Sequence, residues 1–463
     1  MKEHVHFIGI GGTGLSAIAK VLLERGYRVS GSDQKYSPLA QAVEQAGGQV
    51  MIGHQAKNVQ GADVVVRSSA VPDHNVEVQA ALEAGIPVLK RADFLGRLME
   101  NKLSIAIAGT HGKTTTTSMV AWILSALGED PTFIVGGVVQ NLGTNAKAGR
   151  GPAFVIEADE YDYMFLGLSP QIAVVANVEH DHPDIFPTPE AVQDAFLQFA
   201  GRLNPSGVLL FCADDKGAAQ IARAVNEEQK KFSYGISASN LYYRAGQLRI
   251  NKHGGFTFDL YQASNEQPVA TNIELTVPGK HNVQNALAAL AVADQLGLSL
   301  PDAAQALTEF QGSRRRFDVR GEFAGVTIID DYAHHPTAIQ ATLAAAREKY
   351  PQRTIWAVWQ PHTFSRTRTL FERFTKAFED ADQVIVTKVF PSREPIPSDF
   401  SAQEIVDAIE YPPAHFLPEL ESVTEFLIEH LSSGDVLLVL TAGNAIQVSE
   451  QLAKHFKQES FDR

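Results

Sequence analysis

One stretch of the chain, IAIAGTHGKTTTTSMV at residues 105–120, restricts the fold more than any other. An apolar run ends at Gly109, and Gly112, Lys113 and several threonines follow. A buried strand, a glycine loop, a lysine and hydroxyl groups in this order can cradle a polyphosphate and its Mg²⁺. Lys113 would supply a point charge and Thr114 a magnesium ligand. The stretch therefore predicts an α/β domain with a nucleotide-binding loop.

The match to the general phosphate-loop pattern is incomplete. That pattern asks for a glycine at position 107, where the chain has Ile107, so only GTHGKT satisfies it. A purely structural loop is the alternative, but a buried lysine beside four threonines has little packing rationale.

A second glycine motif, GIGGTG, lies near the start of the chain. Gly9, Gly11 and Gly14 stand between an apolar run and a helix-like segment, and Asp33 ends the next predicted strand. This spacing matches the dinucleotide fingerprint, in which glycines let a pyrophosphate approach the N-terminus of a helix. Any nucleotide diphosphate could use such a turn. Tight packing of strand against helix would also explain it.

The order of apolar and polar segments predicts three domains in the 463 residues. We expect an N-terminal Rossmann-like domain at 1–100, a central P-loop ATPase-like α/β domain at 101–312 and a C-terminal Rossmann-like domain at 313–463. Within 240–277, polar and apolar residues alternate around Gly254 and Gly255. This pattern predicts a hairpin, and so a small antiparallel sheet on the central domain.

Composition limits the kind of partner. The net charge is −14, from 39 basic and 53 acidic residues, and no basic block stands out, so we expect no nucleic-acid partner. Cys212 is the only cysteine; it lies in an apolar run, which predicts a buried strand and suits a reducing cytoplasm. No stretch approaches the roughly 20 apolar residues of a membrane span, and no targeting segment is visible, so a cytoplasmic protein is expected.

Acidic and histidine residues follow two apolar runs of the central domain. Glu157 ends AFVIE, and His182 follows VVANVEHD. Both should emerge at the carboxyl edge of the sheet that carries the glycine loop, where they could converge on Mg²⁺. A solvated acidic loop and a helix cap are the alternative interpretations.

Polar motifs of the last two domains are less specific. Asn282 and Asn285 lie on one face of a predicted helix, where they could cap it or bind the edge of a base. The arginines of RRRFD at 314–318 fit a solvated run, and Asp331 fits a helix start. The neighbours His334 and His335 are too close in sequence for a typical zinc pattern, and no cysteine supports one.

The segment WQPHTFSRTR follows a predicted strand of the C-terminal domain. It brings His362, Ser365, Arg366 and Arg368 to the edge where α/β domains bind ligands. Arginine is suited to clamping a carboxylate. The alternative is a cationic helix start, which the helix dipole disfavours.

Taken together, GIGGTG, AGTHGKTTT, EADEYD, NVEHDH, PGKHNVQN, RRRFD, DDYAHHPT and QPHTFSRTR resemble the Mur ligases of bacterial cell-wall synthesis. The resemblance spans nearly the whole chain. It implies an ATP-dependent amide synthesis that joins L-alanine to the lactyl carboxylate of UDP-N-acetylmuramate through an acyl phosphate, with ATP and Mg²⁺ as cofactors. A closely related ligase of the family, which recycles a whole tripeptide, is the alternative, because it shares AGTHGKTTT and EADEYD.

The resemblance also implies a role for each matching residue. Lys113, Glu157 and His182 would be catalytic, and Thr114, Glu157 and His182 would hold Mg²⁺. Residues implied to bind ATP are Gly109, Thr110, His111, Gly112, Lys113, Thr114, Thr115, Asn282, Asn285, Arg316 and Asp331. Residues implied to bind the UDP substrate are Gly11, Gly12, Thr13, Gly14, Asp33, Ser68, Ser69 and Ala70. His335, His362 and Arg366 would meet the amino acid. Some family members have arginine where this chain has Thr363, so the amino-acid carboxylate should depend more on Arg366.

Two further classes stay open at this level. An NAD-dependent oxidoreductase could use GIGGTG, and an ATP-gated binding protein could retain the site without turnover. The sequence does not fix the oligomeric state.

Overall fold

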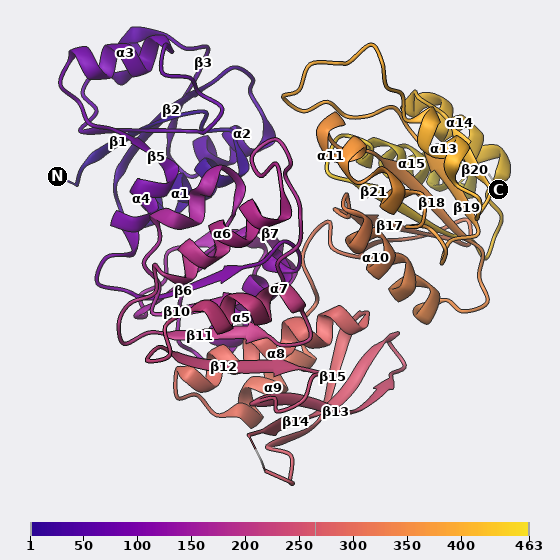
Figure 1. Ribbon diagram of the computed structural model, residues 1–463. Coiled ribbons are helices and arrows are strands. Elements are labelled where there is room, and N and C mark those ends of the chain that lie inside the picture. Colours follow the sequence, from indigo (N-terminus) through magenta and orange to yellow (C-terminus); the bar gives the residue numbers. More distant parts are fainter. Residues whose placement is uncertain (1, 264, 462–463) are drawn as a thin grey trace.

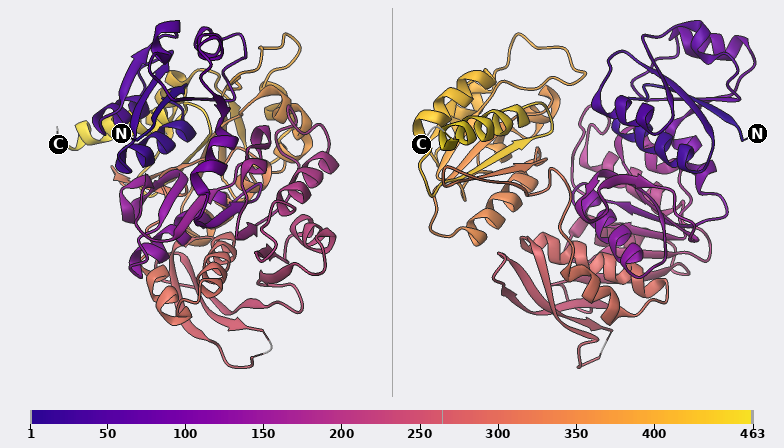
Figure 2. Two further views of the ribbon diagram at one scale, coloured as in Figure 1. Left: turned by 90° about the vertical axis from the view of Figure 1, so that its left-hand side faces the viewer. Right: turned by 180° about the vertical axis from the view of Figure 1, so that it is seen from behind.

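The computed structural model describes residues 2–263 and 265–461. These residues form three α/β units, which Figures 1 and 2 show as a column of the N-terminal and central units with the C-terminal unit beside it. Within the described residues, no helix is both long and apolar enough to cross a membrane. The strands fall into one sheet per unit, as expected, while the domain boundaries near residues 100 and 312 remain predictions.

The N-terminal unit is a parallel sheet with strand order β3-β2-β1-β4-β5. Its elements are β1 (His4–Ile8), α1 (Thr13–Glu24), β2 (Arg28–Asp33), α2 (Pro38–Gln45), β3 (Gln49–Ile52), η1 (Ala56–Val59), β4 (Val64–Arg67), α3 (Val76–Glu83), β5 (Val88–Lys90) and α4 (Arg91–Met99). The strand order reverses at β1, so the glycine turn after β1 lies where open α/β sheets bind ligands.

The central unit carries the sheet β15-β14-β13-β12-β11-β10-β6-β9-β7-β8. Its first elements are β6 (Leu103–Ala108), α5 (Lys113–Ala126), β7 (Thr132–Val139), η2 (Gln140–Leu142), β8 (Thr144–Lys147), β9 (Ala153–Glu157), η3 (Tyr161–Gly167), β10 (Ile172–Val175), α6 (Pro189–Ala200) and β11 (Val208–Cys212). The remainder are α7 (Lys216–Ala224), β12 (Lys230–Gly235), β13 (Tyr243–Ile250), β14 (Gly255–Gln262), β15 (Ala270–Pro278), α8 (Lys280–Gln295) and α9 (Leu300–Thr308).

The antiparallel portion is present, but it continues the central sheet and does not form a separate one. β13 and β14 pair as the predicted hairpin, and β15 adds to it. Tyr234 and Gly235 of β12 pair in parallel with Tyr243 and Arg244 of β13, which joins the two parts. Alternation of polar and apolar residues reports a strand with one solvated face, and it carries no information on the neighbouring strand.

The C-terminal unit has strand order β16-β17-β21-β18-β19-β20, with an antiparallel edge at β16. Its elements are β16 (Asp318–Phe323), β17 (Val326–Asp331), α10 (Pro336–Lys349), β18 (Ile355–Gln360), α11 (Phe364–Thr369), α12 (Phe371–Phe374), β19 (Gln383–Val386), α13 (Gln403–Ala408), β20 (Ala414–Phe416), α14 (Leu420–His430), β21 (Val436–Thr441) and α15 (Ile446–Phe461). The last strand is inserted between β17 and β18, so its connectivity differs from that of the N-terminal unit.

Helices α5 and α8 fix the position of the glycine loop. Most residues of both helices are buried, and the helices pack in one core with the strands of the central sheet. Their N-terminal halves lie together, and the Thr116 hydroxyl of α5 donates to Oδ1 of Asn285 in α8 at 3.1 Å. The Lys113 end of α5 is therefore held against α8.

Candidate active site

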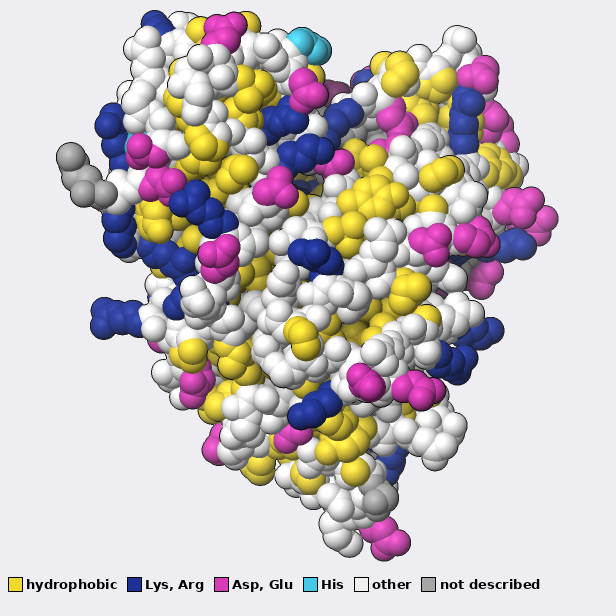
Figure 3. Space-filling model, turned by 60° about the vertical axis from the view of Figure 1, so that its left-hand side comes forward, with side chains coloured by type: hydrophobic (Ala, Val, Ile, Leu, Met, Phe, Trp, Pro, Cys, Tyr) yellow, Lys and Arg dark blue, Asp and Glu magenta, His cyan; other side chains and the backbone are white. Residues whose placement is uncertain are grey.

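A cavity of about 1320 Å³ lies where the three units meet. Its wall includes Thr13 and Gly14 of the N-terminal unit, Lys113 and His182 of the central unit, and Arg366 of the C-terminal unit. Figure 3 shows one face of the molecule, on which lysine and arginine side chains gather around a hollow between the two upper lobes. The cavity collects residues from four predicted site motifs that are far apart in the sequence.

The glycine loop requires glycine for both conformation and space. Gly112, the N-cap of α5, has φ of +78°, a region that side chains disfavour. A Cβ at this position would also lie 2.7 Å from Oδ1 of Asn285. The backbone at the start of α5 is thus packed directly onto α8.

Lys113 is held by a carboxylate at the base of the loop. Its Nζ lies 2.6 Å from Oε2 of Glu160 and donates to the Gly109 carbonyl at 2.6 Å. Burial acts to lower the pKa of Lys113, but Glu160, Asp159 and Glu157 together raise it above its usual value. Lys113 is therefore a permanent cation in the cavity.

Thr114 and Glu157 are brought together as the sequence predicted for magnesium ligands. The Thr114 hydroxyl donates to Oε1 of Glu157 at 3.0 Å, and Oε2 of Glu157 accepts from the Gly136 N–H at 2.7 Å. Arg316 reaches Thr114 Oγ1 from the C-terminal side of the cavity at 3.1 Å. Two oxygen donors on one cavity wall fit a Mg²⁺ ion that also uses phosphate oxygens.

His182 lies at the meeting point of the central and C-terminal units. Its Nε2 is 3.6 Å from Oε1 of Glu160, and its Nδ1 is 3.3 Å from the Arg366 guanidinium. Arg366 is buried and ion-pairs through Nε with Oδ1 of Asp181 at 2.5 Å. Burial acts to raise the pKa of Asp181, but Arg366 holds it well below its usual range.

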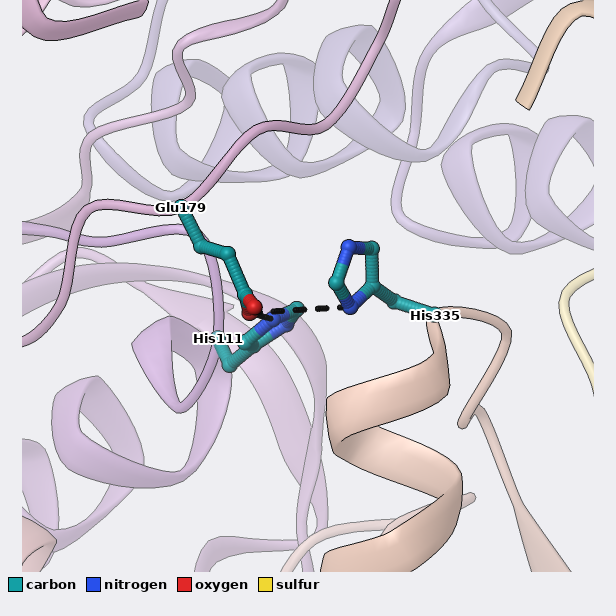
Figure 4. Close-up of side chains that lie close together, drawn as sticks. All are labelled: His111, Glu179 and His335. Carbon is teal, nitrogen blue, oxygen red and sulfur yellow. Dashed lines mark hydrogen bonds and ion pairs between the residues drawn. The ribbon is translucent and has the colours of Figure 1, made fainter. Parts of the chain in front are cut away.

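Glu179 forms a second contact between these two units. Its Oε2 accepts from His111 of the glycine loop at 2.9 Å, while Oε1 accepts from Thr337 at 2.9 Å and Arg373 at 2.5 Å. Burial acts to raise its pKa, but the His111 hydrogen bond, His335 and Arg373 lower it. His335, at the start of α10, completes the group shown in Figure 4.

His335 does not lie where the amino-acid contact was expected. It is fully buried and its Nε2 faces the His180 carbonyl at 3.2 Å, whereas His334 lines the cavity. The reason is local: His335 is the N-cap of α10, and its Nδ1 accepts from the Thr337 N–H. Burial lowers the pKa of His335 to about 3. His334 is therefore the histidine of this pair that lines the cavity, and an amino-acid role for His335 stays a prediction.

His362 and Thr363 line the cavity beside Arg366. Burial and then Arg366 lower the pKa of His362 to about 4, so this imidazole is neutral near pH 7. The cationic start of α11 is balanced by Glu394, which accepts from the Phe364 and Ser365 N–H groups at 2.6 and 3.0 Å. Glu394 therefore accepts hydrogen bonds from the N–H groups at the start of α11 and offsets the positive charge there. Arg366 pairs with Asp181 across the interface between the units.

Asn282, Asn285 and Asp331 line the cavity and also hold its wall. Asn285 Nδ2 donates to Asn282 Oδ1 at 3.0 Å, so neither amide caps α8, whose N-cap is Gly279. Asp331 accepts from the Phe317 and Ala333 N–H groups, both at 2.7 Å. Asp331 thereby fixes the loop that carries Arg316.

The N-terminal glycine turn is built as predicted, but only part of it faces the cavity. Gly9 has φ of +89°, and Asp33 accepts from the Gly11 N–H at 2.9 Å. Thr13 and Gly14 lie on the cavity wall, whereas Gly11, Gly12, Asp33 and the segment 68–70 do not. A UDP role for these residues stays a prediction.

Four functional candidates are absent from the residues singled out in the sequence: Arg91, Glu160, Glu179 and Asp181. Glu160, Glu179 and Asp181 belong to the motifs EADEYD and NVEHDH, so the sequence does carry a signal for these three residues. Arg91 contacts Asp159 at 3.1 Å, and its guanidinium fills the space that a Cβ at Gly14 would need. No sequence pattern marks Arg91, because its partners come from two other segments.

Three α/β units surround one cavity with a glycine loop in its wall, an arrangement that is typical of nucleotide-dependent enzymes. Family models match three successive segments: the Mur ligase family, catalytic domain at residues 4–103, the Mur ligase middle domain at 107–293 and the Mur ligase, glutamate ligase domain at 315–443. The chain belongs to the Mur ligase family.

Individual relatives cover nearly the full length. The chain is 44% identical over 460 residues to the UDP-N-acetylmuramate--L-alanine ligase of Geotalea daltonii, covering 98% of each chain. Among solved structures, it is similar to UDP-N-acetylmuramate-alanine ligase from Thermotoga maritima, with a TM-score of 0.82, 28% identity and coverage of 98% and 99%. A murein peptide ligase from Psychrobacter arcticus gives a TM-score of 0.71 at 26% identity, with 98% of both chains covered.

Proposed function

We propose that the protein is an ATP-dependent ligase that joins L-alanine to the lactyl carboxylate of UDP-N-acetylmuramate in peptidoglycan synthesis. The names of the relatives support this substrate pair. The observation that carries the proposal is one shared cavity whose lining includes Lys113, Thr13 and Arg366, one from each unit. An enzyme that joins three substrates needs such a shared site. We place this reaction in the cytoplasm, where ATP is available.

The chemistry explains why ATP is needed. A carboxylate has no competent leaving group, and phosphorylation converts it to an acyl phosphate that the amine of L-alanine can attack. Lys113 is placed to offset charge on the transferring phosphoryl group, and Arg316 reaches the same region beside Thr114. Holding the reactants in line can supply on the order of 7–11 kcal/mol of the barrier.

Thr114 and Glu157 are the residues that would hold one Mg²⁺, and His182 would help to hold a second with Glu160 beside it. Mg²⁺ would neutralise phosphate charge when bound. The first donor set fits the ion because it is made of oxygens, and in the second the Glu160 carboxylate supplies oxygens beside the His182 imidazole. Lys113 forms an ion pair with Glu160, so the Glu160 carboxylate contacts both the lysine and the second proposed Mg²⁺ site.

Three regions are proposed to bind the organic substrates. The UDP substrate would use the turn 11–14 with Arg91 beside Gly14. The ATP base would meet Asn282 and Asn285 on α8. His334, His362 and Arg366 would meet L-alanine, with Arg366 acting from its fixed position against Asp181.

The tripeptide-recycling ligase is the second candidate. The murein peptide ligase relative supports it through its shared fold. The L-alanine enzyme is favoured, because the full-length relatives at 44% and 43% identity carry that name and the TM-score is higher for the corresponding solved structure.

A phosphate-release screen tests the proposal. The full chain is given ATP, Mg²⁺ and UDP-N-acetylmuramate with L-alanine, glycine, L-serine or the tripeptide. We expect the highest kcat/KM with L-alanine. No phosphate should be released when either UDP-N-acetylmuramate or the amine substrate is omitted. Highest kcat/KM with the tripeptide would replace the proposal with the recycling reaction.

A further inference from the structure

Two histidines and one glutamate converge at the contact between the central and C-terminal units. His111 comes from the glycine loop, Glu179 from the segment after β10 and His335 from the start of α10 (Figure 4). One nitrogen or oxygen of each lies within 4.8 Å of the other two. The group shares no residue with the proposed magnesium ligands, so it is a separate arrangement of donor atoms.

The hydrogen bonds of His335 identify the nitrogen that offers a lone pair. Nε2 lies 3.2 Å from the His180 carbonyl, which accepts only, so Nε2 carries the proton. Nδ1 accepts a long hydrogen bond from the Thr337 N–H at 3.3 Å and faces Oε2 of Glu179 at 3.7 Å. Two acceptors thus point at the same space. A backbone carbonyl bound to the second ring nitrogen is also the arrangement that orients metal-ligating histidines.

The two carboxylate oxygens of Glu179 contact different groups of side chains. Oε1 is taken by Arg373 at 2.5 Å and Thr337 at 2.9 Å. Oε2 faces both imidazoles, at 2.9 Å from His111 and 3.7 Å from His335. Zn²⁺ bonds of about 2.0–2.2 Å place neighbouring ligand atoms about 3.4 Å apart in a tetrahedral site. The two separations lie on either side of that value.

We propose that His111 Nε2, Glu179 Oε2 and His335 Nδ1 bind one transition-metal dication of the Zn²⁺ class. Binding moves the His111 proton from Nε2 to Nδ1 and replaces the long Thr337 hydrogen bond. Two imidazoles and one carboxylate suit Zn²⁺ or Co²⁺, whereas Mg²⁺ prefers oxygen donors. The His111 and Glu179 side chains are 20% and 25% exposed, which leaves a way in and a fourth position for water.

The proposed site pairs His335 with a histidine that is distant in the sequence, and not with its sequence neighbour. His335 is excluded from a zinc site with its neighbour His334, but the fold supplies His111 from another unit as its partner. Because the ligands come from two units, an occupied site links the glycine loop to the start of α10.

Cobalt titration tests the site without any need for turnover. The full chain, without an affinity tag, is freed of metal and titrated with Co²⁺ in the absence of nucleotide and Mg²⁺. We expect one equivalent to produce the intense visible absorption of tetrahedral Co²⁺, and an equivalent of Zn²⁺ to abolish it. Only the weak absorption of octahedral Co²⁺ in the wild type would overturn the proposal.

Variants in both units locate the metal. His111→Ala and His335→Ala should each remove the intense absorption, and Glu179→Gln should weaken Co²⁺ binding at least about tenfold. His182→Ala, at the proposed magnesium site, and His334→Ala, the neighbour of a ligand, are matched controls that should retain it. Circular dichroism identifies any variant that does not fold. If a variant of one unit does not fold, the ligand variant in the other unit decides whether the metal binds at this site. Absorption that persists in a folded His111→Ala or His335→Ala protein would refute the assignment.

Discussion

The guanidinium of Arg366 lies 2.5 Å from the carboxylate of Asp181, and both side chains are almost completely buried between the central and C-terminal units. Arg366 also lies 3.3 Å from Nδ1 of His182. One ion pair therefore joins two units and orients a proposed magnesium ligand. Arg366, which is expected to bind the amino-acid carboxylate, therefore also links the central and C-terminal units.

Removing the charge of one partner of this ion pair should severely weaken the contact between the central and C-terminal units. Asp181→Asn leaves a buried guanidinium without its counter-charge, which typically costs about 3–5 kcal/mol. We expect kcat/KM for phosphate release to fall by roughly a hundredfold or more, with all three substrates affected. Steady-state kinetics for each substrate measures this.

Arg368→Ala is the matched control for that variant. Arg368 pairs with Asp399, but both side chains are exposed, and such pairs contribute about 1 kcal/mol or less. Its kcat/KM should fall less than about fivefold. An Asp181→Asn enzyme as active as Arg368→Ala would show that the buried pair does not support catalysis.

Lys113→Ala should separate phosphoryl transfer from substrate binding. The substitution removes the cation that the glycine loop holds against Glu160, so phosphate release should fall to background. UDP-N-acetylmuramate affinity, measured by calorimetry, should stay near the wild-type value. Lys147→Ala, which removes an exposed lysine paired with Asp130, should leave both quantities unchanged. Normal turnover in Lys113→Ala would contradict the proposed role of the loop.

Glu157→Gln should raise the requirement for Mg²⁺. The amide keeps the shape of the side chain beside Thr114 but loses the charge that attracts the ion. We expect the Mg²⁺ concentration for half-maximal turnover to rise about tenfold or more at fixed ATP. Glu190→Gln, on the exposed first turn of α6, is the control. Coincident Mg²⁺ curves for Glu157→Gln and the wild type would remove Glu157 from the ligand set.

Local motifs predicted the parts of the site that lie within one turn of chain. The glycine loop, the start of α5 and the ends of β9 and β10 follow from a strand, a glycine and a helix in sequence, and the Mur ligase assignment that rests on them is confirmed. Gly112 is an example, because its positive φ belongs to the loop itself.

Contacts between units could not be predicted in this way. Arg366 and Asp181 stand 185 positions apart, and nothing in either segment specifies the other. His335 shows the same limit: its sequence context gives a helix start and so its N-cap role, but its contact with Glu179 depends on the packing of α10 against the central unit. The antiparallel strands were likewise predicted, while their continuity with β12 depends on a pairing that periodicity does not encode.

Asp330 should make the C-terminal unit less stable as the pH rises. It is 2% exposed in β17, and burial raises its pKa to about 6 from the usual 3.8, although Arg320 lies 3.0 Å away. A raised carboxyl pKa means that the folded state binds more protons than the unfolded state between these values. The stabilisation is therefore complete below about pH 4 and is lost as the pH rises through about 6.

Asp330→Asn removes this titration and keeps the size of the side chain. The difference between the two pKa values corresponds to at most about 3 kcal/mol. We expect the variant to gain stability relative to the wild type between pH 4.5 and pH 7.5, and to show no further relative gain above that. Calorimetric unfolding of both proteins across this range measures the difference. A difference that is constant with pH, or that reverses in sign, would show that Asp330 is ionised throughout and that Arg320 outweighs the cost of burial.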